Sequence, residues 1–172
     1  MEEKFTVGII VSNHFGVLNR VAGLYAKRGY NIDSLAVGET ENPAFSRMTI
    51  VSTGDEFMKN QVLRQLEKLH DVKSVVLLER GNSVSIEHML IKLHVGCSGK
   101  AAISDLINDF GGKVMDFGGD FITAEVTGGS EKIERFIDHA RDFGILELCR
   151  SGLISMILGT DQVFSIRELS SR

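Results

Sequence analysis

The apolar residues of this chain change their spacing in the same order twice, and this internal repeat constrains the fold more than any single motif. Alternation with a period of two is typical of strands, whereas recurrence every three or four residues is typical of amphipathic helices. Residues 5–78 predict the order strand, helix, strand, strand, helix, strand, and residues 86–158 predict it again. In this split βαβ arrangement a four-stranded sheet carries both helices on one face. We therefore predict an α+β chain of two ferredoxin-like βαββαβ domains.

Glycines, polar pairs and one proline, Pro43, mark the ends of the predicted elements. In the first repeat we expect strands over 5–11, 32–37, 45–51 and 72–78 and helices over 17–28 and 58–69. In the second we expect strands over 86–96, 113–117 and 121–126, one strand or a pair over 145–158, and helices over 103–110 and 133–140, the last capped by Ser130. The predicted domains are 1–79 and 84–159, joined by a linker over 80–83 and followed by a weakly ordered or partner-dependent tail over 160–172.

Several predicted strands carry apolar residues at successive positions, as in Ile9-Ile10-Val11 and in the run from Val75 to Leu78. Helices on one side of a sheet bury only every second residue of a strand. We therefore expect the second face of each sheet to meet another copy of the chain or the other domain.

The charge balance argues against two classes of partner. The chain has 19 Lys and Arg residues against 23 Asp and Glu residues, which leaves no basic footprint for nucleic acid or for an anionic membrane surface. The acidic start, Met1-Glu2-Glu3-Lys4, lacks the basic region and apolar core of a signal peptide, and no apolar run spans a bilayer. We expect a cytoplasmic protein in which Cys97 and Cys149 are free, partly buried thiols.

RNA-recognition domains share the split βαβ order, so RNA binding needs a separate test. Those domains place two or three aromatic residues on their central strands within a basic surround. The third predicted strand here carries one aromatic residue, Phe45, and the chain is acidic. These observations argue against RNA binding.

The residues with reactive side chains form no catalytic or metal-binding pattern. The stretch from Gly96 to Lys100 has two residues between its glycines, where a phosphate-binding loop has four. His94 and Cys97 are three apart on a predicted strand and would point to opposite faces, which disfavours a shared metal. Asp55-Glu56 fits the negative first turn of a helix better than an acid–base pair. We expect no catalytic residue and no metal ligand in this chain.

One junction does indicate a binding site. After the first predicted strand, Ser12-Asn13-His14-Phe15-Gly16 leads directly into a helix. The first N–H groups of a helix lack intrahelical partners and lie at the positive end of its dipole, so they favour a carboxylate or a phosphate. The alternative is that Asn13 and Gly16 only shape and cap the helix start.

Three ungapped blocks closely resemble the regulatory small subunits of acetolactate synthase, also called acetohydroxyacid synthase. The blocks are Asn13–Val21, Arg28–Leu35 and Ser46–Ile50, and Gly54-Asp55 follows where that family has it. Arg150-Ser151-Gly152 extends a looser resemblance to about Gly159. Phe15 occupies a loop position where the family has a smaller residue.

The resemblance implies an amino-terminal ACT domain, a second ferredoxin-like domain and a homodimer. Members of this family are not catalytic. They bind the thiamine-diphosphate-dependent large subunit, raise its activity and confer feedback inhibition by valine in branched-chain amino acid biosynthesis. The resemblance implies no cofactor in this chain, and it implies thiamine diphosphate, Mg²⁺ and FAD in the catalytic large subunit.

The resemblance also places valine between the ACT domains of two protomers. The matching positions are Asn13, His14, Phe15, Gly16, Val17 and Leu18 from one protomer and Asn31 and Ile32 from the other. Backbone N–H groups near Gly16, Val17 and Leu18 could take the carboxylate, the side-chain oxygens of Asn13 and Asn31 could accept from the ammonium group, and Val17, Leu18 and Ile32 suit an isopropyl group.

A helix of about twelve residues separates the loop from Asn31 by roughly 18 Å within one chain, so one small ligand would need Asn31 from a neighbouring copy. The competing hypothesis is a free-standing ACT-domain amino-acid sensor that regulates another protein.

Overall fold

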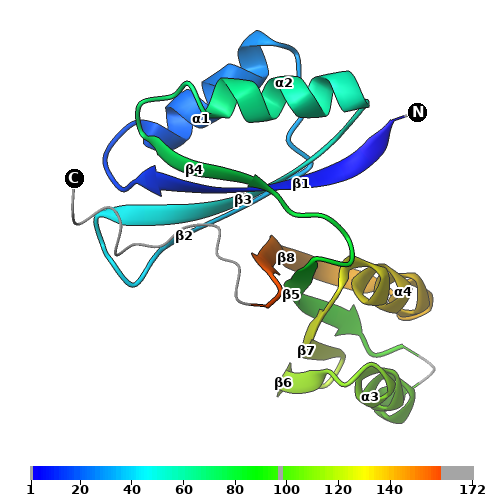
Figure 1. The fold of residues 1–172 in the computed structure, drawn as a ribbon. Coiled ribbons are helices and arrows are strands. Elements are labelled where there is room, and N and C mark those ends of the chain that lie inside the picture. Colours follow the sequence, from blue (N-terminus) through cyan, green and yellow to red (C-terminus); the bar gives the residue numbers. More distant parts are fainter. Residues whose placement is uncertain (1, 97–98, 160–172) are drawn as a thin grey trace. The chain divides into compact units, whose positions relative to one another are not determined.

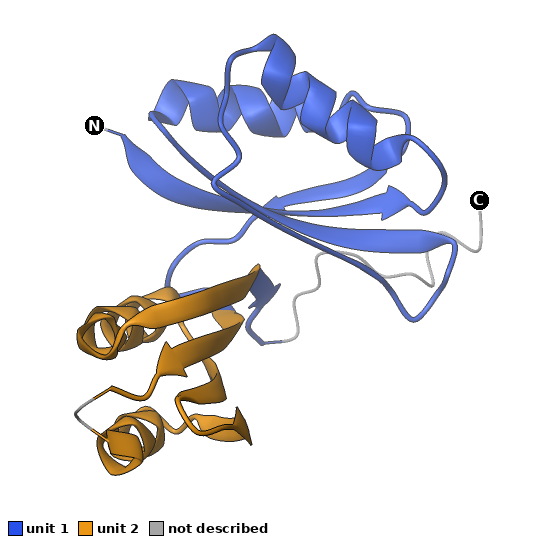
Figure 2. Ribbon diagram, turned by 180° about the vertical axis from the view of Figure 1, so that it is seen from behind, with its two compact units in different colours: residues 1–84, 153–172 blue, residues 85–152 orange. Residues whose placement is uncertain are grey.

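The structure is a computed structural model that describes residues 2–96 and 99–159 (Figure 1). Its elements form two four-stranded antiparallel sheets, with strand orders β2-β3-β1-β4 and β6-β7-β5-β8. Each sheet carries two helices on one face, as the repeated spacing predicts. The chain divides into two compact units (Figure 2): the first takes residues up to Val84 and again from Leu153, and the second is Ser85–Gly152.

The first unit builds its sheet around the long central strands β1 and β3. Its elements are β1 (Glu3–Ser12), α1 (Val17–Lys27), β2 (Ser34–Glu39), β3 (Phe45–Gly54), α2 (Glu56–Leu66) and β4 (Val72–Leu77). In the centre of the sheet Val7 of β1 lies opposite Ile50 of β3 on one side and Leu77 of β4 on the other. Because alternate residues of these strands face the helices, they pack with the apolar faces of α1 and α2 in one core.

The opposite face of this sheet is also buried at its centre. Ile10, Thr49 and Val51 face away from the helices and are buried. The same unit contains the chain from Leu153 onward, where the Leu153 N–H donates to Ser34 Oγ and Arg47 Nη2 donates to the Ser155 carbonyl oxygen at 2.6 Å. The centre of this face is therefore buried within the chain, and the expected contact with another copy of the chain or with the other domain stays a prediction.

The second unit repeats the arrangement with a shorter first edge strand. Its elements are β5 (Ser83–His94), α3 (Gly99–Asp109), β6 (Lys113–Phe117), β7 (Phe121–Gly128), α4 (Ser130–Ala140), a 3₁₀ turn (Arg141–Phe143) and β8 (Ile145–Ile157), whose last residues fall in the first unit. The core lies between α3, α4 and the central strands β5 and β7. Within it Phe136 meets the ring of Phe110 edge to face, with the centroids 5.3 Å apart.

The structure corrects three local predictions. Helix α2 ends at Leu66, three residues early, because the chain turns there and the Leu69 N–H donates to the Leu66 carbonyl oxygen. Ser130 is the first helical residue of α4 and makes no cap, since Gly129 holds that position. Of the two alternatives expected over 145–158, one strand or a pair, the structure has one strand, β8. Cys149 on this strand is exposed rather than partly buried. The predictions for Cys97 and for the tail over 160–172 lie outside the described residues.

Asp55 caps α2, as its place before the helix predicts. Its Oδ1 accepts from the Met58 N–H at 2.7 Å, and Glu56 adds a second negative charge in the first turn. Asp55 and Glu56 thus stabilise a helix start.

Tyr25 of α1 is 1% exposed, and this burial raises the pKa of its hydroxyl to about 12, with the neighbouring Ser52 hydroxyl opposing the rise. The pKa of this hydroxyl is higher in the folded chain than its unfolded value of about 10, so the folded state favours the neutral form. The resulting contribution to folding stability is fully present below pH 10 and is lost as the pH rises through 12. We expect the free energy of unfolding to fall by about 2 kcal/mol as the pH rises from 10 to 12. Urea unfolding of Tyr25→Phe should lack this loss and that of Tyr30→Phe should keep it; an unchanged loss in Tyr25→Phe would exclude the assignment.

Candidate functional site

Gly16 is the last residue of the loop between β1 and α1. Its φ is +86°, in the left-handed region that a residue with a Cβ atom enters only at a cost in free energy. No side chain caps α1, and no acidic residue stands in its first turn. A Cβ atom built on Gly16 meets nothing within 4 Å. The start of α1 is therefore exposed and uncapped.

Four backbone N–H groups at this helix start lack an acceptor. Among the described residues, no backbone or side-chain atom accepts from the N–H of Phe15, Gly16, Leu18 or Asn19. The Val17 N–H donates to the His14 carbonyl oxygen over 3.4 Å, so it is the one predicted donor already in use. The remaining N–H groups lie at the positive end of the helix dipole and can bind a carboxylate.

Asn13 is held in place by two hydrogen bonds from its amide nitrogen. Its Nδ2 donates to Glu39 Oε1 and to the Pro43 carbonyl oxygen, both at 2.9 Å, and its backbone N–H donates to the Ala44 carbonyl oxygen. Because the amide nitrogen must face these acceptors, the Oδ1 atom is left as an acceptor beside the loop. This oxygen suits an ammonium group.

Asn31 is oriented in the same way as Asn13, with its amide nitrogen donating a hydrogen bond. Its Nδ2 donates to Asp33 Oδ1 at 2.7 Å, which again leaves Oδ1 as an acceptor, and the side chain is exposed. The eleven residues of α1 separate Asn31 from the loop by about 16 Å along the helix. The structure thus gathers the predicted residues from Asn13 to Leu18 in the loop and the first two residues of α1, and it leaves Asn31 and Ile32 at the other end of that helix.

The apolar side chains of the loop differ sharply in exposure. Phe15 is 101% exposed and Leu18 is 46% exposed, whereas Val17 is 3% exposed and packs in the core of the first unit. Ile32 is half-buried against the same core. Phe15 and Leu18 are therefore the apolar groups that this loop offers to a ligand or a neighbouring chain.

Asp71, just before β4, was not among the predicted site residues. Its Oδ1 lies 3.0 Å from His14 Nε2, its Oδ2 accepts from Arg20 Nη1, and its side chain is 6% exposed. Desolvation raises the pKa of this carboxyl, but the hydrogen bonds and charges of Arg20 and His14 outweigh it and hold the pKa below its ordinary value. Asp71 stays ionised at neutral pH and can only accept hydrogen bonds.

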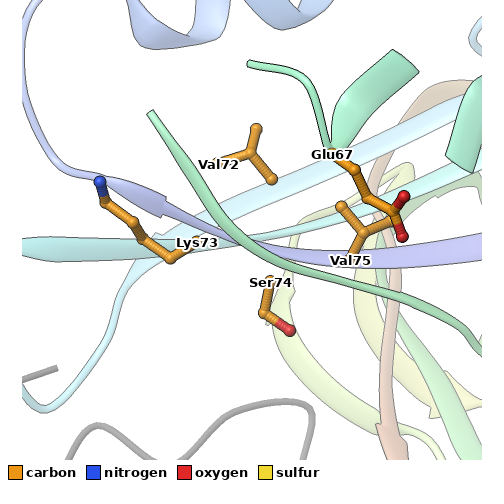
Figure 3. A pocket seen from close by; sticks show the side chains of 5 residues that line it. All are labelled: Glu67, Val72, Lys73, Ser74 and Val75. Carbon is orange, nitrogen blue, oxygen red and sulfur yellow. The ribbon is translucent and has the colours of Figure 1, made fainter. Parts of the chain in front are cut away.

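A separate shallow depression of about 210 Å³ lies between the end of α2 and β4 (Figure 3). Glu67, Val72, Lys73, Ser74 and Val75 line it, and none of them is a predicted effector residue. In Figure 3, Glu67 reaches toward Val75 while Lys73 points away. Residues 2–96 and 99–159 hold no cluster of three His, Cys, Asp or Glu side chains that could bind a metal ion, and no helix among them is long and apolar enough to cross a membrane.

Two family models match the chain, one in each half. Residues 7–74 match the ACT domain described as similar to that of the AHAS small subunit, and residues 86–159 match the model described as the small subunit of acetolactate synthase. The two matches include every predicted effector residue and the Arg150-Ser151-Gly152 segment.

Curated relatives and a solved structure agree with these matches. A probable acetolactate synthase small subunit of Methanothermobacter thermautotrophicus is 42% identical over 155 residues, which cover 90% of this chain and 92% of that protein. The acetolactate synthase small subunit of Mycobacterium leprae is 38% identical over 162 residues, covering 94% and 96%. The crystal structure of the small subunit from Thermotoga maritima superposes with a TM-score of 0.85 at 34% identity, covering 92% of this chain and 99% of that one.

Proposed function

Because the chain belongs to the family of acetolactate synthase small subunits, we propose that it is a non-catalytic regulatory subunit. In this proposal it binds and activates the thiamine-diphosphate-dependent large subunit and confers feedback inhibition by valine on branched-chain amino acid biosynthesis in the cytoplasm. Thiamine diphosphate, Mg²⁺ and FAD belong to the large subunit, and this chain contributes the effector site.

The observation that carries the effector proposal is the set of unpaired N–H groups at the exposed start of α1. The valine carboxylate would accept from the N–H groups of Gly16, Leu18 and Asn19, which have no acceptor among the described residues. The ammonium group would donate to Asn13 Oδ1, whose amide nitrogen is held by Glu39 and Pro43. Leu18 would meet the isopropyl group.

The second half of the site would come from another copy of the chain. Asn31 offers an acceptor oxygen of the same kind, yet it lies about 16 Å from the loop of its own chain along α1. Strand β2, which follows Asn31, is an edge of the first sheet and carries the exposed Val37, so its outer side is open to a neighbour. We therefore propose a homodimer in which Asn31 and Ile32 of one protomer complete the site at the loop of the other.

Reconstitution with the large subunit tests the function. The chain alone should form no acetolactate from pyruvate, even with thiamine diphosphate, Mg²⁺ and FAD. Added to the purified large subunit, it should raise acetolactate formation several-fold and make that activity fall on addition of valine. Turnover by the isolated chain would exclude a non-catalytic role.

The same experiment separates the competing hypothesis of a free-standing sensor. A chain that binds valine but neither co-purifies with the large subunit nor changes its rate would be a sensor of that kind. Activation of the large subunit without any response to valine would instead support the activating role and exclude the proposed effector site.

A further inference from the structure

We propose that Asp71 is a positioning residue that holds the loop of residues 13–16 in the shape that receives the effector carboxylate. This inference deepens the proposed function and rests on it for the identity of the effector. Asp71 does not touch the effector itself and acts through His14 and Arg20.

Asp71 binds the loop and the helix on both sides of the unpaired N–H groups. Its carbonyl oxygen accepts from the Ser12 N–H at 2.8 Å, where the chain leaves β1. One oxygen of its carboxylate contacts His14 of the loop, and the other accepts a hydrogen bond from Arg20 of α1. Since the side chain is only 6% exposed, water competes weakly for these contacts. Asp71 therefore fixes the entry to the loop through its backbone, and its buried carboxylate fixes the middle of the loop and the helix that follows.

His14 connects Asp71 to the peptide group that carries the Gly16 N–H. The ring contacts Asp71 through Nε2 at 3.0 Å and the Phe15 carbonyl oxygen through Nδ1 at 3.2 Å. In a trans peptide the carbonyl of residue 15 and the N–H of residue 16 point in opposite directions. Turning the Phe15 carbonyl toward His14 therefore turns the Gly16 N–H away from it.

Arg20 connects Asp71 to the first turn of α1. Its side chain binds Asp71, and its backbone N–H donates to the Gly16 carbonyl oxygen at 3.0 Å. The helix start, which supplies the N–H groups of Leu18 and Asn19, is thus tied to β4 as well as to the loop. Without Asp71 the loop would have to be ordered when the effector binds, which lowers affinity.

Asp71→Asn tests the proposal because it keeps the size of the side chain and removes its charge. We expect the Kd for valine, measured by calorimetry on the full chain, to rise about 10- to 100-fold while activation of the large subunit without valine is unchanged. Faster amide hydrogen exchange at Gly16 and Leu18 of the free chain should accompany this change. Exchange is read without valine, so it tests the positioning role even if valine is not the effector.

Glu87→Gln is the matched control. Glu87 is a carboxylate of equal burial, with its side chain 6% exposed, and it binds Arg150 through two hydrogen bonds of 2.7 Å in the second unit. Its loss should lower the unfolding temperature but leave the valine Kd and the exchange of Gly16 and Leu18 unchanged. Equal effects of the two variants on the loop would show a general loss of stability and would overturn the proposal.

His14→Leu covers the case in which Asp71→Asn fails to fold, because the His14 side chain is 52% exposed and its loss leaves the core intact. We expect it alone to raise the valine Kd several-fold and to speed exchange at Gly16. Combined with Asp71→Asn, it should add less than it does alone, because both changes break one chain of contacts. Fully additive effects, or unchanged exchange at Gly16 in either variant, would overturn the proposal. If the wild-type chain binds no valine but the two variants show these exchange changes, the proposed effector is contradicted and the positioning role of Asp71 is retained.

Discussion

Gly16→Asp is expected to abolish valine inhibition of the reconstituted complex while the chain still folds and still activates the large subunit. The new carboxylate would stand at the N–H groups that the proposal assigns to the valine carboxylate. Two like charges about 4 Å apart at a protein surface repel by roughly 4 kcal/mol. We expect the Kd for valine to rise at least about 100-fold, as measured by calorimetry and by inhibition curves.

Folding should survive this change for two structural reasons. A Cβ atom on Gly16 meets nothing within 4 Å, so the side chain has room. The left-handed backbone at φ +86° then costs about 1–2 kcal/mol, which is less than the stability of an ordinary domain.

Two control variants separate charge from backbone strain. Gly16→Asn carries the same strain and nearly the same volume without the charge, so it should weaken valine binding much less. Gly81→Asp carries both strain and charge at φ +93°, in the connection between β4 and β5, and should leave the valine Kd unchanged. Normal valine inhibition in Gly16→Asp would show that the start of α1 is not part of the effector site.

The repeated elements could be predicted from the sequence because each leaves a local periodic signal. The alternation in β1 and the spacing of α1 give those elements to within two residues, and β6 is predicted at its observed bounds, Lys113–Phe117. The end of α2 was predicted three residues late because Leu69 continues the helical spacing, although the chain turns there toward β4. The Ser130 cap was wrong because a serine at a helix start has the same sequence signal whether it precedes the helix or begins it.

The site could be predicted only as far as its local part. The strand, glycine and helix around Gly16 follow one another in sequence, so the unpaired N–H groups were predictable from that order. Asp71 was not, because it lies 57 residues from His14 and 51 from Arg20, and no periodicity marks contacts over such separations. That the Val17 side chain is buried and Phe15 fully exposed depends on how α1 packs on the sheet, which the pattern of the loop does not determine.

Mixed dimers carrying two different lesions are expected to keep half of their valine sites. Asn31→Ala removes the acceptor oxygen proposed for the ammonium group, and a hydrogen bond to a charged group is worth about 1.5–3 kcal/mol, so that chain alone should bind valine about 10- to 100-fold more weakly. In a dimer of one Gly16→Asp chain and one Asn31→Ala chain, a shared site would combine both lesions in one pocket. The other pocket would have an intact loop and an intact Asn31.

The reciprocal dimer is the control for this experiment. A chain with both substitutions, paired with a wild-type chain, would have one lesion in each pocket if the sites are shared, and both sites should be weak. If each site lies within one chain, this dimer would instead keep one normal site.

In the proposed homodimer the loop of one protomer and Asn31 of another form one effector site. The most direct test of this shared site is a calorimetric count of valine sites in purified mixed dimers of Gly16→Asp and Asn31→Ala chains, separated by two different affinity tags. We expect one site per dimer with the wild-type Kd. A mixed dimer in which both sites are weakened, with no site of wild-type affinity, would contradict the shared site.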